Sequence, residues 1–130
     1  MNPMSDPKDD PWLPTQAIVD QFLLHSSMLK SLATEVRELS KKKQQDSLNV
    51  TKVRLINRVL EPLKTEILMK LPSSAFLDIL DEDLLPSNSD AVLVISQYEA
   101  ALAEFRSEFY RKEAIGYEYY WATVEHEAEQ

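Results

Sequence analysis

The two histidines and their acidic neighbours are the first residues to test for metal or catalytic chemistry. His126 stands between Glu125 and Glu127, and histidine and carboxylate side chains are ordinary zinc ligands. Consecutive residues on a helix point about 100° apart, so these three side chains do not converge on one ion. Neither His25 nor His126 has a glutamate three residues before it, as the Glu-x-x-His pattern of helical di-iron proteins requires. We therefore predict no metal and no cofactor.

Cysteine nucleophiles, the serine nucleophile elbow and Gly-rich phosphate-binding loops are also missing from the sequence. The chain has no cysteine and a single glycine, Gly116. A Gly-rich phosphate loop and a G-x-S-x-G nucleophile elbow each need more than one glycine, and without cysteine there is no thiolate catalysis and no disulfide. Tight β-turns also depend on glycine, so a hairpin-rich fold is disfavoured. The sequence predicts a helical protein that is not an enzyme.

His25 lies inside a long apolar series with the spacing of a coiled coil. The series alternates steps of four and three residues: Ile18, Phe22, His25, Leu29, Leu32, Val36 and Leu39. Such spacing indicates a helix that packs along one face. Two interpretations of His25 stay open. It is either a partly buried histidine with a hydrogen-bond partner, or a pH-sensitive group in a helix interface, because histidine changes charge near neutral pH.

The charge of the chain is unevenly distributed. The net charge is −8, yet residues 30–70 hold ten basic and five acidic residues, whereas residues 71–130 hold three basic and thirteen acidic ones. Six basic residues around the first predicted turn form a candidate surface for phosphates or an acidic partner: Lys41, Lys42, Lys43, Lys52, Arg54 and Arg58. The alternative is an ordinary solvated helix end. Overall acidity disfavours a general nucleic-acid binder, so a nucleic-acid-associated regulator using residues 30–70 is the second functional hypothesis.

Aromatic residues near the C-terminus are the most suggestive feature. Tyr117, Tyr119, Tyr120 and Trp121 lie within five residues, and on a helix they would point in different directions, so one core cannot take all four. Tyr and Trp are enriched at interface hot spots. They are therefore either half buried and half exposed within the fold, or a patch that anchors a protein partner. Trp12 is a further candidate contact, which would otherwise pack on the first turn of the following helix.

The elements that carry these residues follow from capping and proline positions. Four prolines in residues 1–14 predict an extended arm, and residues 15–130 are expected to form one helical domain. Thr15 is the expected cap of the first long helix, and Asp46 or Ser47 that of the second. The second helix is expected over 46–70, with Pro62 either kinking it or dividing it in two.

Two more helices complete the expected fold. A short one is predicted over 76–85, and a long one starts at a Ser87–Asp90 capping box and continues to about Gly116. The predicted fold class is an all-α antiparallel bundle of three long helices and one short helix, with the extended arm at its N-terminus.

The functional expectation follows from what the helices lack. Long helices with heptad spacing and no catalytic apparatus suit a non-catalytic protein–protein interaction module, such as an adaptor, an assembly factor or a small subunit of a larger complex. The partner would be a second copy or another protein. No apolar stretch approaches the roughly 18 residues of a membrane span, and the first twenty residues lack the profile of a secretory signal. We expect an intracellular protein, cytoplasmic or nuclear, that does not insert into membranes.

Overall fold

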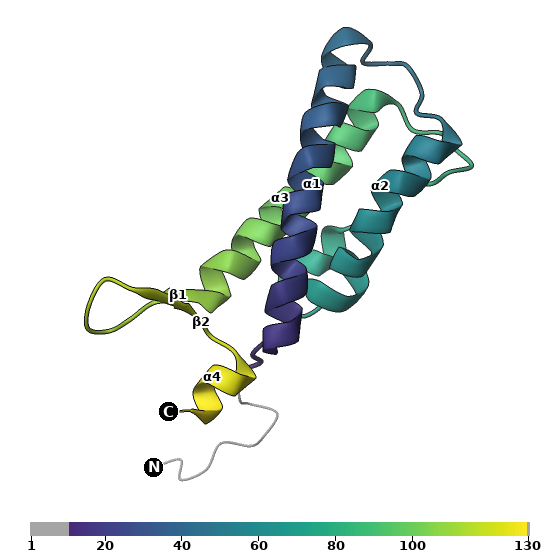
Figure 1. Cartoon of the computed structure of the whole chain (residues 1–130). Coiled ribbons are helices and arrows are strands. Elements are labelled where there is room, and N and C mark those ends of the chain that lie inside the picture. The colour runs from purple at the N-terminus through teal and green to yellow at the C-terminus, as the bar shows by residue number, and fades with distance from the viewer. Residues whose placement is uncertain (1–10, 130) are drawn as a thin grey trace.

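The computed structural model describes residues 11–129 and shows a mostly helical protein. Its α-helices are α1 (Gln16–Lys42), α2 (Val50–Pro62), α3 (Asn88–Phe109) and the short α4 (Val124–Ala128). A π-helical turn, η2 (Leu63–Ile67), and a 3₁₀ helix, η3 (Pro72–Phe76), lie between α2 and α3, and strands β1 (Tyr110–Lys112) and β2 (Tyr119–Trp121) form a hairpin. Figure 1 shows α1 crossing α3 at an angle, with α2 beside them. The hairpin projects from the end of α3. The helical fold class is confirmed, with a small sheet in addition.

The first helix begins where the sequence predicts. The Thr15 hydroxyl accepts a hydrogen bond from the Ile18 amide at 3.2 Å. The buried face of the helix is rotated slightly from the predicted apolar series. Val19 and Ala33, which are not in that series, are buried, whereas Ile18 and Leu32 pack at the edge of the core. Of the predicted arm, residues 1–10 lie outside the described residues, and residues 11–14 lead into α1 without regular secondary structure.

The second helix differs from the prediction at both ends. Its cap is Asn49, whose side chain accepts from the Lys52 amide at 2.8 Å, so the expectation of Asp46 or Ser47 was wrong. Pro62 neither divides the helix nor leaves it regular. The chain continues into the π-helical turn η2, in which the Leu68 amide donates to the Leu63 carbonyl at 2.7 Å. A wider turn tolerates the missing proline amide and ends the helix before Lys70.

The segment after η3 is extended, so the helix predicted over 76–85 was wrong. Leu77 and Leu80 are buried, and side chains of α2 and α3 form hydrogen bonds with the extended backbone. The Asn57 side chain donates through Nδ2 to the Leu80 carbonyl at 2.8 Å, and its Oδ1 accepts from the Leu80 backbone amide at 2.9 Å. The Tyr98 hydroxyl donates to the Asp78 carbonyl at 2.9 Å. Side chains thus replace the ladder of a neighbouring strand.

The third helix begins at the predicted capping box. The Asp90 amide donates to the Ser87 hydroxyl at 3.1 Å, and the Ser87 amide donates to the Asp90 carboxylate at 3.2 Å. Its buried face joins the core shared with α1 and α2. Arg37 of α1 also reaches α3, where it donates to Glu99 and, at 3.3 Å, to Ser96. The hydrogen bond to Glu99, together with the charge of that carboxylate, raises the pKa of the Arg37 guanidinium.

The end of the third helix is the largest difference from the prediction. The helix stops at Phe109, and the chain forms a hairpin that pairs Tyr110 with Trp121 and Lys112 with Tyr119. Gly116, expected to loosen or end a helix, lies in the hairpin loop with φ 108°. Glycine adopts this conformation without the strain that a Cβ would cause. A single glycine is therefore enough for a single hairpin.

Candidate protein-binding site at the C-terminal hairpin

The base of the hairpin is fixed by an aromatic cluster that joins β2 to the helices. The Trp121 ring lies 5.5 Å from Phe22 of α1 and 4.9 Å from Tyr110 of β1, measured between ring centroids. Phe22 in turn stacks on Phe105 of α3 at 4.5 Å. Such edge-to-face and stacked pairs are worth about 0.5–1.5 kcal/mol beyond their buried area. Trp121 therefore ties the hairpin to the core.

One face of the hairpin continues this cluster outward. The side chains of Tyr119 and Trp121 lie on the same face because residues two apart on a strand do so. Tyr119 stacks on Tyr110 across the two strands at 5.3 Å with an interplanar angle of 19°. The Arg106 guanidinium lies 4.6 Å from the Tyr110 ring and 5.8 Å from the Trp121 ring. These cation–π contacts hold the strands in one orientation relative to α3.

The tip of the hairpin exposes large apolar side chains. Ile115 is 90% exposed and Tyr117 is 88% exposed, and the neighbouring Tyr119 is also exposed. The Lys112 ammonium lies 5.3 Å from the Tyr117 ring. The sequence prediction missed Ile115, although it stands beside the only glycine, where a loop was possible. Ile115, Tyr117 and Tyr119 together form what we call the hairpin tip.

The opposite face of β2 connects to the last helix. Tyr120 stacks on His126 of α4 with ring centroids 4.6 Å apart. The Thr123 hydroxyl caps α4 by accepting from the His126 amide at 3.0 Å. Glu125 points elsewhere, because its carboxylate accepts from the Gln16 amide at 2.7 Å. Within residues 11–129 no three histidine or acidic side chains gather at a place that could hold a metal ion.

Trp12 lies at the same end of the molecule as the hairpin base. Its ring contacts Phe109 edge to face at 5.5 Å, and Phe109 contacts Phe105 at 4.9 Å. The structure thus brings Trp12 and Trp121 into one aromatic cluster, although 108 intervening residues separate them in the sequence. Trp12 is nevertheless 36% exposed.

His25 lies in the first half of α1, three residues after Phe22 of the aromatic cluster. It is partly buried. Its Nδ1–H donates to the Gln21 carbonyl of the preceding turn at 2.9 Å, so this hydrogen bond stays within one helix. Of the two interpretations made from the sequence, this contact fits a histidine with a backbone partner.

The predicted basic surface is interrupted by carboxylates. Lys41 pairs with Glu38 at 3.2 Å and Lys43 with Asp46 at 3.8 Å. Arg54 donates to both oxygens of Glu82, at 2.9 and 3.2 Å, and lowers the pKa of that carboxyl. Lys42 lies at the end of α1, and Arg58 faces the space between α1 and α2. Each of these ion pairs offsets positive charge that a phosphate would otherwise meet.

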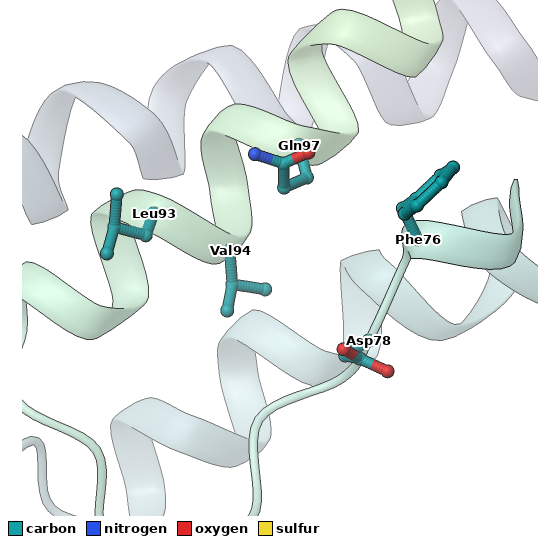
Figure 2. Close-up of a pocket in the computed structure, with 5 residues that line it drawn as sticks. All are labelled: Phe76, Asp78, Leu93, Val94 and Gln97. Carbon is teal, nitrogen blue, oxygen red and sulfur yellow. The ribbon is translucent and has the colours of Figure 1, made fainter. Parts of the chain in front are cut away.

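A separate hollow has a mostly apolar lining and no evident catalytic groups. It has a volume of about 270 Å³ and lies between α3 and the segment after η3. Figure 2 shows Leu93, Val94 and Gln97 on α3, with Phe76 and Asp78 on the neighbouring segment. One carboxylate and one amide do not form a nucleophile–base pair.

Within the described residues no helix combines the length and the apolar character needed to cross a bilayer. The chain matches no protein-family model, no curated protein and no solved structure.

Proposed function

We propose that this chain is a non-catalytic protein–protein interaction module that binds its partner with the hairpin tip. The observation that carries the proposal is the exposure of Ile115 and Tyr117 on a hairpin whose base is fixed. Exposed apolar side chains gain about 25 cal/mol for each Å² removed from water on binding. Tyrosine is also among the residues that carry most of the energy at interfaces.

The fixed base makes the tip an effective contact. A segment that is already ordered loses less conformational entropy on binding. Stacking of Tyr110 on Tyr119, with Arg106 over Tyr110, orders the strands before any partner arrives. We therefore expect the partner to present an apolar cleft that receives the tip, with polar groups at its edge for the tyrosine hydroxyls.

The helices serve as the scaffold in this proposal. We propose that α2 and α3 pack antiparallel to α1 as one bundle, a view supported by the core they share and by their directions in Figure 1. An adaptor, an assembly factor and a small subunit of a larger complex all fit such a scaffold. We further propose that it acts in the cytoplasm or the nucleus.

The test removes the apolar character of the tip without touching its base. The Ile115→Ser/Tyr117→Ser variant is compared with Leu84→Ser, a matched control because Leu84 is 78% exposed outside the hairpin. Partners captured by the tagged chain are purified and titrated against each variant. We expect about a tenfold or greater loss of affinity for the double variant, which is about 1.4 kcal/mol, and none for the control.

Two outcomes would contradict the proposal. The first is unchanged partner affinity in a double variant whose circular dichroism and thermal unfolding match those of the wild type. The second is an equal loss with Leu84→Ser, since binding would then depend on general surface hydrophobicity and not on the hairpin tip.

A further inference from the structure

We propose that the groove between α1 and α2 is a second docking site, which takes an amphipathic helix whose apolar face is flanked by acidic residues. The groove consists of two hollows, with volumes of about 360 Å³ and 200 Å³. Leu32 of α1 and Leu55 of α2 line both hollows, so the two are continuous. The groove therefore follows the two helices for several turns.

The lining of the groove is mostly apolar and partly exposed. Its main apolar residues are Met28, Leu32 and Leu39 of α1, and Leu48, Leu55 and Val59 along and just before α2. Met28 and Leu55 are exposed, as is Leu24, one turn before Met28. Side chains four apart on a helix lie on one face. A groove with apolar walls on two helices is a usual receptor for a third helix.

The charges at the groove favour an acidic occupant. Lys52 lines one hollow and Arg58 the other, so each end of the α2 wall carries a cation. Within residues 11–129 neither side chain forms an ion pair, whereas Arg54 on the same helix is paired with Glu82. Glu35 is the one acidic residue in the lining. Complementary charges steer partners and fix their register, so carboxylates beside the apolar face of the ligand would meet Lys52 and Arg58.

A second copy of this chain is a poorer occupant than another protein. Its long acidic helix is α3, which carries Glu99, Glu104 and Glu108. The apolar face of α3 is already buried in its own core through Ile95 and Phe105, among others. A second copy would have to unfold α3 to place that face in the groove. The ligand we infer is therefore a helix of a different protein.

The groove proposal is independent of the hairpin proposal, because the two surfaces share no residue. Figure 1 shows α1 and α2 on one side and the hairpin projecting on the other. The Ile115→Ser/Tyr117→Ser variant should leave ligand binding in the groove unchanged. Failure of one proposal is thus distinguishable from failure of the other.

The experiment uses a displayed library of helical peptides as its probe. Each peptide keeps leucines at helical spacing along one face, and its flanking positions vary among Glu, Lys and Gln. Selection against the full chain should enrich glutamate at the flanks. The best peptide should lose about tenfold or more in affinity with Leu55→Asp. The matched control Leu93→Asp should have no effect, since Leu93 is 65% exposed on α3, outside the groove, while Leu55 is 46% exposed.

A charge reversal provides the second arm of the experiment. The Lys52→Glu/Arg58→Glu variant changes only exposed residues of α2, so it should fold and shift the enrichment from glutamate to lysine. No enriched peptide, lysine enrichment with the wild type, or unchanged selectivity after the reversal would overturn the proposal. So would a wild-type dimer in sedimentation that Leu55→Asp dissociates, because the groove would then hold a second copy.

Discussion

At the scale of single residues, the Tyr98 hydroxyl is a polar group placed in the middle of the core. The side chain is fully buried, and its hydroxyl donates to the Asp78 carbonyl. Burial, with smaller contributions from the charges of Asp78 and Glu61, raises the pKa of Tyr98 to about 12. The folded state therefore holds the neutral phenol at pH values at which an unfolded chain would release the proton. This contribution to stability is fully present below about pH 10 and lost as the pH rises to about 12.

The variant Tyr98→Phe tests this argument. It removes the hydroxyl and leaves the Asp78 carbonyl without its donor. We therefore expect the free energy of unfolding to fall by about 1 kcal/mol at about pH 9. Between about pH 10 and 12 the free energy of unfolding of the wild type should fall by roughly 2–3 kcal/mol. The variant, which has no phenol at this position, should not show this fall. Urea unfolding at several pH values measures the difference, with Tyr117→Phe as the exposed control. Parallel loss of stability in wild type and Tyr98→Phe would show that the buried phenol is not responsible.

Residue roles that depend on nearby sequence were predictable, and those that depend on distant contacts were not. Thr15 and the Ser87–Asp90 box were found because a cap acts within three residues. Asn49 was missed because Asp46 and Ser47, equally good caps by type, stand just before it. The pairing of Asn57 with Leu80 could not be predicted, because nothing around Asn57 shows that an extended segment 23 residues later lies against it.

At the scale of elements, the hairpin was missed although its strand carries a visible signal. Tyr117, Tyr119 and Trp121 alternate with other residues at the period of two that is typical of a strand. The helical spacing of Phe105 and Phe109 instead predicted a helix that continues to about Gly116, so neither strand of the hairpin was expected. The alternation also explains the site, since it places Tyr119 and Trp121 on the face of Tyr110 and turns Tyr120 toward His126.

The aromatic residues of the hairpin should divide into those that stabilise the fold and those free to bind. Trp121→Ala removes contacts with Phe22, Phe105 and Tyr110, so we expect a loss of about 3 kcal/mol in the free energy of unfolding. Tyr117→Ser changes an exposed residue and should stay within about 0.5 kcal/mol of the wild type. Chemical denaturation measures both. Equal stability of the two variants would show that the hairpin folds independently of the helices.

At the scale of the whole molecule, the C-terminal segment closes the fold on the start of the first helix. The Val124 amide donates to the Pro14 carbonyl at 3.0 Å, and the Glu125 carboxylate accepts from the Gln16 amide. Thr15 already caps this helix, because its hydroxyl accepts from the Ile18 amide. The backbone amides of the first turn of α1 thus find acceptors both in the residue before the helix and in α4. A negative charge at a helix N-terminus is favourable because it faces the positive end of the helix dipole.

The closure predicts a link between stability and partner binding. Glu125→Ala should lower the free energy of unfolding by about 0.5–1 kcal/mol, less in high salt, whereas Glu127→Ala, also exposed on α4, should have little effect. Hydrogen exchange at the Gln16 and Ile18 amides should accelerate in the first variant alone.

Because α4 follows β2 after only Ala122 and Thr123, loosening the contact between Glu125 and Gln16 should also let the hairpin base move. Affinity for a partner of the hairpin tip should then fall, although no residue of the tip has changed. Unchanged exchange at the first turn of α1 would contradict this coupling, since the dipole contact would then be too weak to hold the C-terminal segment in place.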